Sequence, residues 1–174
     1  MATILLNQTN RLRVSGKELE IIKQLCHLSK NLFNVGLYNV RQYFFTEGKF
    51  LRYESAYHHA KSNENYDLLA TDIGQQTLKV VDRSFRSFFN LIKLKRAGQL
   101  NAQVNLPRYL PKEGYFMIVI PVRGRDWSRL PSKDWMYSIP GSRKFKRENG
   151  TVEIKIPERV RNKAVKEIRI IPRQ

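Results

Sequence analysis

The sequence predicts an α+β fold, in which a small β-barrel is interrupted after its first strand by a helical subdomain. Apolar residues recur with the helical period of 3.6 between residues 16 and 96, and with the strand period of two beyond residue 114. Residues 97–114 separate the two regions and contain two Gly and two Pro, which break regular structure. An extended segment precedes the helices. We therefore assign residues 1–15 and 103–174 to the barrel and residues 16–102 to the helical insertion.

The first elements follow from local signals. Residues 3–14 favour an extended strand, and Ser15 is a suitable N-cap for a long helix over residues 17–45. Gly48 would end this helix, and a short helix at residues 53–63 and a connection follow it. The expected apolar face of the long helix consists of Leu19, Ile22, Leu25, Leu28, Leu32, Val35 and Val40.

The helix expected over residues 75–96 has an apolar face and a basic face. Asp72 and Gln75 have the spacing of a capping box, which would fix its start. Asp82 is the only acid between Lys79 and Arg96, so like charges repel and helix stability does not explain them. The apolar stripe consists of Leu78, Val81, Phe85, Phe88 and Ile92, with Phe89 beside it. The opposite face carries Gln75, Gln76, Lys79, Arg83, Arg86, Asn90 and Lys93, and Lys95 and Arg96 follow at the helix end.

Strand signals dominate the last third of the chain. Residues 115–121 are rich in aromatic and β-branched side chains, and residues 165–172 alternate in polarity. Asn149-Gly150 lies between two alternating runs, a pattern that predicts a β-hairpin. Residues 123–141 show no period, and we expect a long loop that contains Trp127 and Trp135.

Charge points to a polyanionic partner. The chain has a net charge of +17 and a pI near 10.3, and its apolar fraction of 41% indicates a folded protein. Residues 1–78 carry 9 basic and 7 acidic side chains (net +2), whereas residues 79–174 carry 23 and 8 (net +15). Nucleic acid is therefore favoured over a membrane or an acidic protein.

The remaining composition narrows the class of protein. Cys26 is the single cysteine, which excludes a disulfide or a Cys-rich zinc site within this chain and favours a small core residue. The N-terminal residues lack the pattern of a secretory signal, and no apolar run approaches the length of a membrane span. We expect a cytoplasmic location.

Several basic and aromatic residues are candidate nucleic-acid contacts besides the basic helix. Arg108 and Tyr109 lie in a Pro-stiffened segment, where Tyr109 suits either base stacking or packing at a barrel edge. Gln75 suits either an adenine contact or the capping box. The hairpin arm would present Arg143, Lys144, Lys146 and Arg147, with Phe145 between them.

The sequence does not suggest a catalytic site. Cleavage by two metal ions needs several carboxylates that converge on the ions, but Asp82, Asp126 and Asp134 are scattered singly among basic residues. His58 and His59 are adjacent, so on a helix they point in different directions, and no third ligand is apparent. We expect no catalytic residue, metal or cofactor in this chain.

Four patches, in order, resemble a known family. They are LSKNLFNVGLYNVRQYFF, QQTLKVVDRSFRSFF, LPRYLPKEGYF and VEIKIPERV with KEIRIIPR. Their order and spacing are similar to those of TnpB (OrfB) proteins, which are insertion-sequence-encoded, RNA-guided DNA nucleases related to type V CRISPR effectors. The resemblance covers roughly residues 11–173.

The resemblance implies an oligonucleotide-binding barrel, the wedge, interrupted by a helical recognition domain. In the family these parts hold guide RNA and target DNA with a short flanking motif. The family's RuvC-like nuclease domain, which needs Mg²⁺, and its zinc ribbon would lie beyond Gln174. We therefore expect the non-catalytic front part of such a protein. The alternatives are a basic RNA-scaffold protein and a stand-alone metal-dependent nuclease with an unrecognised site.

Overall fold

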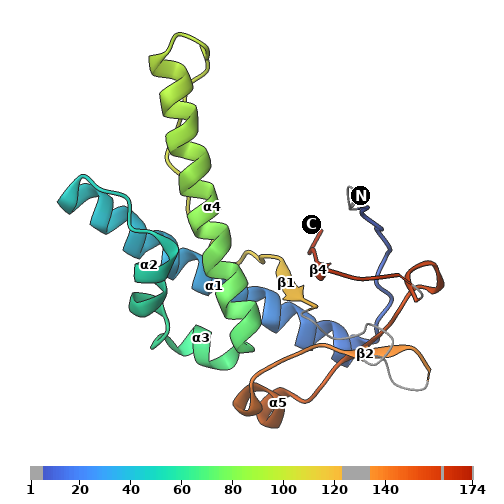
Figure 1. Ribbon diagram of the computed structural model, residues 1–174. Coiled ribbons are helices and arrows are strands. Elements are labelled where there is room, and N and C mark those ends of the chain that lie inside the picture. The colour runs from blue at the N-terminus through green and yellow to red at the C-terminus, as the bar shows by residue number, and fades with distance from the viewer. Residues whose placement is uncertain (1–5, 123–133, 162, 174) are drawn as a thin grey trace.

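The computed structural model describes residues 6–122, 134–161 and 163–173 of the 174-residue chain. A long helix, α1, is crossed by a second long helix, α4, which extends well past it (Figure 1). Two smaller helices, α2 and α3, lie on one side of this crossing, and short strands lie on the other. The helices are α1 (Gly16–Glu47), α2 (Tyr53–Ala60), α3 (Glu64–Leu68), α4 (Thr71–Arg96) and α5 (Arg143–Asn149). The strands are β1 (Ile118–Pro121), β2 (Met136–Ser138), β3 (Glu153–Lys155) and β4 (Glu167–Ile170), with a 3-10 turn, η2, at Glu158–Val160.

Helix α1 begins and ends where the sequence predicts. Ser15 is the N-cap and forms a capping box with Glu18, whose carboxylate accepts a hydrogen bond from the Ser15 backbone N–H at 2.8 Å. This bond lowers the pKa of Glu18. Gly48 ends the helix in the left-handed conformation (φ 62°), which glycine adopts without strain. The expected apolar face is buried or half-buried except at Leu19, which is 41% exposed because it precedes the first packed turn.

The α1–α4 crossing depends on a close approach of the two helices. A Cβ atom on Gly36 of α1 would lie 2.7 Å from Leu78 Cδ2 and 3.3 Å from Val81 Cγ2 of α4, so a larger residue there would require these side chains of α4 to shift. Ser29 and Thr77 share a buried hydrogen bond of 3.1 Å across the same interface. Phe85 is fully buried beyond the crossing and stacks on Phe50. The expected core stripe of α4 is therefore confirmed as far as Phe85.

Polar side chains of α1 hold the chain where it returns from α4. Asn34 clamps Leu110 by accepting from its N–H at 2.9 Å and donating to its carbonyl at 3.0 Å. Arg41 donates to the Pro107 carbonyl at 3.1 Å. Lys30 is buried and donates to the Lys112 carbonyl at 2.6 Å, and Ser29 donates to the Met117 carbonyl at 2.9 Å. The backbone carbonyl of Cys26 also accepts a hydrogen bond from the Phe116 N–H. Together, these five residues of α1 are called the α1 clamp: Cys26, Ser29, Lys30, Asn34 and Arg41.

The strands form two separate two-stranded antiparallel sheets, β1–β4 and β2–β3. In the first, Ile118 pairs with Ile170 and Ile120 with Ile168, and in the second Tyr137 pairs with Ile154. The α+β class is confirmed, but the strands of the described residues pair as two separate sheets and do not close into a barrel. The described part of the expected first strand, residues 6–15, forms no strand and adds no edge to either sheet. It is exposed except at Val14, which is half-buried and packs against the core.

The predicted Asn149-Gly150 hairpin is wrong. Residues 143–149 form helix α5, and Gly150 ends it with a positive φ of 92°. Ser142 caps the helix start by accepting from the Phe145 N–H at 3.1 Å, and Phe145 is buried in the core. An Asn-Gly pair supplies the positive φ that either a tight turn or a helix end requires, and here the capped helix with a buried Phe is formed.

Three smaller features also differ from the prediction. Strand β2 lies in the stretch expected to be a loop, of which residues 123–133, with Trp127, are outside the described residues. The connection after α2 contains helix α3, whose N-cap Asn63 accepts from the Asn65 N–H. Helix α4 begins at Thr71 after Ala70, so Asp72 lies inside its first turn and the capping box with Gln75 is wrong.

One hydrophobic cluster joins the helical and strand-bearing parts. It contains Leu25 and Ile73 from the helices together with Ile118 of β1, Ile139 and Phe145. Cys26 lies in the same cluster, as predicted, and burial raises the pKa of its thiol to about 12. Both parts therefore depend on the same buried residues. In the described residues, no helix has an apolar run that could cross a membrane.

Removing the Asn34 clamp should destabilise the fold measurably. Asn34→Ala leaves the Leu110 N–H and carbonyl without their partner, which costs about 1–3 kcal/mol. For a domain of this size that corresponds to a fall in Tm of about 2–4 °C per kcal/mol. Urea unfolding and thermal melts measure the change, with Gln42→Ala, an exposed side chain of the same helix, as the control. Equal stability of the two variants would contradict the role of the clamp.

Candidate nucleic-acid interface

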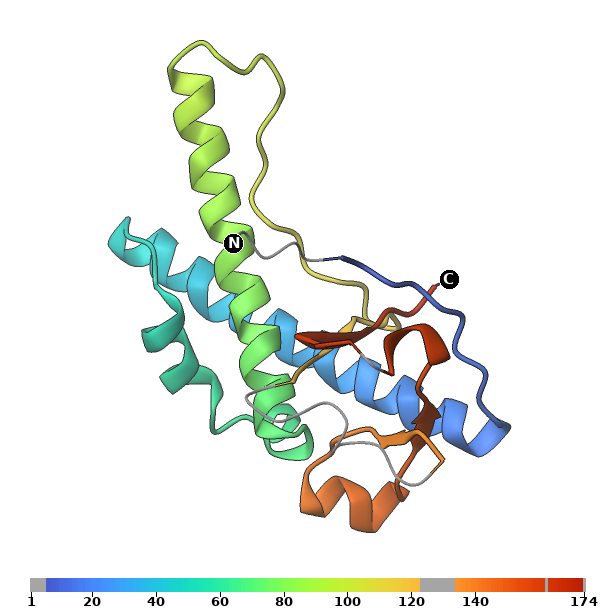
Figure 2. The same ribbon diagram turned by 45° about the vertical axis from the view of Figure 1, so that its right-hand side comes forward.

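The basic face of α4 is exposed along most of the helix. Lys79, Gln75 and Gln76 near its start are half-buried, whereas Arg83, Arg86 and Asn90 are exposed. The C-terminal end of α4 projects from the body of the protein, with the returning chain beside it (Figures 1 and 2). Lys93, Lys95 and Arg96 are exposed on this projection. At 1.5 Å per residue, Arg83 and Arg96 lie about 20 Å apart along the axis.

Two of the predicted basic residues have partners within the protein. Arg86 donates from Nε to the Asp82 carboxylate at 2.6 Å, and its side chain is 57% exposed. Asp82 is buried and also accepts from the Tyr53 N–H at 3.0 Å, at the start of α2, where a negative charge suits the helix dipole. Lys79 Nζ lies 5.2 Å from the centre of the Tyr53 ring. Arg86 and Lys79 thus help to position α2, in addition to any ligand contact.

The projection and the returning chain form a continuous surface without acidic residues. The sequence has no Asp or Glu between Asp82 and Glu113. This stretch contains the basic half of α4 and the segment with Arg108 and Lys112. A solvated surface normally mixes both signs of charge. The absence of acids over this stretch produces a positive potential that a polyanion would neutralise.

Arg108 and Tyr109 lie on the returning segment and are both exposed. Tyr109 is 44% exposed, and the Arg41 guanidinium carbon lies 5.0 Å from its ring centre. Tyr109 lies outside both sheets of the described residues, on the segment between α4 and β1. The base-stacking interpretation stays a prediction.

The residues predicted on the hairpin arm lie instead on α5. Arg143, Lys144 and Arg147 are exposed and Lys146 is half-buried, while Phe145 between them is buried. Helix α5 lies at the opposite end of the molecule from the tip of α4 (Figures 1 and 2). The structure therefore divides the predicted contact residues into an α4 group with Arg108 and Tyr109, and a separate α5 group.

Gln75 and Gln76 lie one turn inside α4, near the buried Tyr66. Burial is the main reason why the pKa of Tyr66 is raised, and the Gln75 side chain acts in the opposite direction. Because Gln75 is not part of a capping box, two interpretations of its side chain stand: packing near Tyr66 and the predicted contact with a base. Neither glutamine is as exposed as the arginines that follow.

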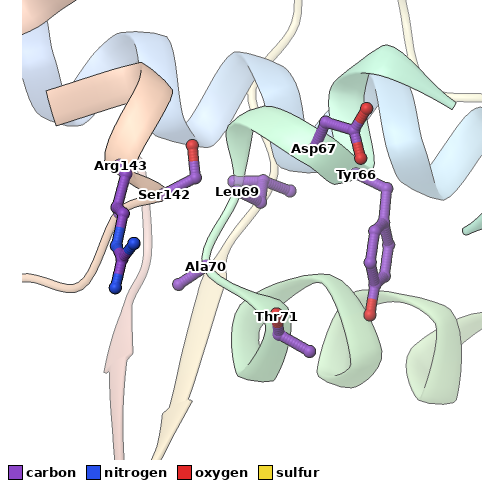
Figure 3. A pocket seen from close by; sticks show the side chains of 8 residues that line it. Tyr66, Asp67, Leu69, Ala70, Thr71, Ser142 and Arg143 are labelled. Atoms are coloured by element: carbon purple, nitrogen blue, oxygen red, sulfur yellow. The ribbon is translucent and has the colours of Figure 1, made fainter. Parts of the chain in front are cut away.

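A pocket of about 370 Å³ lies between the α3–α4 junction and the start of α5 (Figure 3). Arg143 and Ser142 approach from α5, and Asp67, Ala70 and Thr71 from the opposite side. Tyr66, which also lines the pocket, lies on the opposite side of it from Arg143 (Figure 3). The carboxylate of Asp67 opposes binding of an anion beside Arg143, so this pocket does not extend the basic surface.

The described residues contain no set of side chains suited to metal-dependent cleavage. No group of three or more His, Cys, Asp or Glu side chains converges there. Asp82 is engaged by Tyr53 and Arg86, Asp134 is exposed, and Asp126 lies outside the described residues. His58 and His59 are exposed on α2, as expected for surface histidines, and His58 packs edge-on against Tyr57.

Sequence reasoning missed one group of exposed residues. Tyr38, Arg41 and Phe45 of α1 lie beside the returning segment and are at least partly exposed. A usable signal was present, because the sequence has no acid between Glu20 and Glu47 although aromatic residues and Arg41 cluster there.

Comparison of the chain with protein-family models and with curated proteins finds no match. The similarity to TnpB proteins thus depends on the four sequence patches alone.

Charge reversal at two neighbouring arginines should distinguish an arginine that stabilises the fold from one that is only exposed on the surface. Arg86→Glu places a second carboxylate beside the buried Asp82 and should lower the free energy of unfolding by about 1–2 kcal/mol. Breaking a fully buried ion pair costs about 3–5 kcal/mol, and the loss is smaller here because the Arg86 side chain is 57% exposed. Arg83→Glu, at an exposed position three residues earlier, should change stability by no more than about 0.5 kcal/mol. Thermal and urea unfolding of both variants measure the difference, and equal losses would contradict the structural role of Arg86.

Proposed function

We propose that this chain is the nucleic-acid-binding portion of a TnpB-like, RNA-guided transposon nuclease. Its role is to hold guide RNA and target DNA with a short flanking motif, and cleavage belongs to residues outside this chain. The family's nuclease domain would require Mg²⁺ and its ribbon zinc, neither of which this portion is proposed to bind. The family assignment is supported by the four ordered sequence patches, and the binding role by the charge of α4.

The observation that carries the binding role is the projecting, acid-free half of α4. Arg83, Lys93 and Arg96 are exposed on it, and no carboxylate follows Asp82 until Glu113. Basic residues in the last turn of α4 interact favourably with the helix dipole. Like charges at this density nevertheless repel one another, and the dipole does not account for Arg83, which lies far from the helix end. A phosphate backbone, with one negative charge per about 1.7 Å of duplex, would offset the repulsion by releasing its counterions.

The test is the salt dependence of binding. Arg83→Glu, Lys93→Glu and Arg96→Glu together avoid Arg86, so the Asp82 pair stays intact. Each lost phosphate contact removes about 0.9 from the magnitude of the log–log salt slope on duplex and about 0.7 on single strands. The triple variant should therefore flatten the slope by about two to three units, measured by titrating RNA and duplex DNA at several salt concentrations.

A matched control carries the same change in net charge at scattered positions. Lys17, Lys61 and Lys163 are exposed and distant in sequence from α4, and their reversal to Glu should weaken binding without the same change in slope. Thermal melts of both triple variants exclude unfolding as the cause. If the α4 variant keeps the native slope, its basic face is merely solvated and the proposal fails.

The purified chain should cut neither strand of DNA, because no described carboxylates converge on a common point. The measurement is incubation with plasmid or single-stranded DNA in Mg²⁺ or Mn²⁺, followed by gel analysis of the products. Cleavage that survives further purification and disappears when one acid is mutated, Asp126→Ala or Asp134→Ala for example, would show that the chain is itself a nuclease.

A further inference from the structure

Arg41 of α1 connects two exposed aromatic rings. Its guanidinium carbon lies 5.0 Å from the centre of the Tyr109 ring and 5.7 Å from that of Phe45, both within cation–π range. The same side chain donates to the Pro107 carbonyl. Arg41 is thereby fixed in place, and it fixes the position of Tyr109 relative to α1.

A third aromatic residue extends this group along the helix. Tyr38, Arg41 and Phe45 follow the spacing i, i+3 and i+7, which places them on one stripe of α1. Asn34, four residues before Tyr38, lies on the same stripe and clamps Leu110 next to Tyr109. The three rings and Arg41 therefore form one surface at the junction of α1 and the returning segment, which we call the aromatic platform.

The platform is unusually open for aromatic side chains. Tyr38 is 54% exposed, Phe45 57% and Tyr109 44%. Phe and Tyr normally contribute most when buried, so three exposed rings, of which Phe45 and Tyr109 lie against Arg41, give the fold little. The returning segment is held by the hydrogen bonds of the α1 clamp and by packing of Leu106 and Leu110, none of which uses the exposed faces of the rings.

The chemistry around the platform selects the kind of ligand. Both segments that form it lie in acid-free stretches, between Glu20 and Glu47 and between Asp82 and Glu113. Arg108, exposed next to Tyr109, can contact a phosphate. Flat rings beside arginines in a positive field match single-stranded nucleic acid, in which bases stack on the rings while the backbone follows the charge. A duplex hides its base faces and cannot use them.

We propose that the aromatic platform binds unpaired bases of a single-stranded segment by stacking on Tyr109, Phe45 and Tyr38, with Arg108 holding the adjacent phosphate. This inference rests on the proposed function and specifies one substrate of it, a single strand, whether RNA or DNA.

The experiment compares strands that differ only in their bases. Native protein is titrated with a single-stranded DNA oligonucleotide, with an abasic strand of equal length and charge, and with the RNA counterpart. Stacking is worth about 5- to 150-fold in Kd per base, so the abasic strand should bind at least about fivefold more weakly. Tyr109→Ala and Phe45→Ala should each reduce this ratio of affinities toward one, and Tyr109→Phe should preserve it.

Controls distinguish the possible failures. Tyr115→Ala removes an exposed tyrosine that contacts His27 outside the platform, and should leave the ratio unchanged. Phe45→Ala changes only a surface ring of α1, so it tests the inference even if Tyr109→Ala unfolds. A native ratio of one, with a steep salt slope on both strands, overturns the platform and leaves the proposed function standing. No binding to any strand overturns both, and the DNA and RNA arms show which strand is preferred.

Discussion

The structure depends on how an irregular stretch of backbone obtains its hydrogen bonds. Between α4 and β1 the chain runs across α1 without belonging to any sheet, and buried peptide groups without partners are costly. Side chains of α1 supply those partners. Asn34 satisfies both groups of Leu110, and Lys30, buried beneath the segment, donates to the Lys112 carbonyl. Because this clamp delivers the chain to β1 in a fixed position, the β1–β4 sheet, the core around Ile118 and the exposed Tyr109 all follow from it.

The apolar contacts of α4 end part-way along the helix, and this divides it into a buried first part and an exposed last part. Gly36 lets α4 approach α1 closely, and Val81 and Phe85 use that contact to bury the middle of the helix. Beyond Phe89 no residue of α4 is buried: Ile92 is half-buried, and Leu91 and Leu94 are exposed. The same helix therefore has a rigid base and a free basic end. The proposed binding element is thus positioned by the core without being covered by it.

The sequence predicted the helices better than the sheets, for a physical reason. The period of 3.6 in α1 and α4 and the Ser15 and Gly48 signals are local, and so they survived in the structure. A barrel requires pairing between distant strands, which no local pattern specifies, and Asn149-Gly150 serves a helix end as well as a turn. The site shows the same limit. The basic stripe could be read from spacing, but the pairing of Arg86 with Asp82, and the position of Arg41 between two rings, depend on tertiary contacts.

The basic end of α4 and the aromatic platform differ in what they could contribute to binding. Phosphate contacts are long-ranged, weaken with salt and carry no information about bases, so they give attraction and register. Stacking is short-ranged and requires an unpaired base, so it distinguishes single strands from duplex. Both surfaces are connected through the segment with Arg108, which runs from the tip of α4 to the α1 clamp. A polyanion drawn to the helix end would thus meet, along a stretch of chain without acidic residues, the aromatic platform, which is proposed to distinguish a paired strand from an unpaired one.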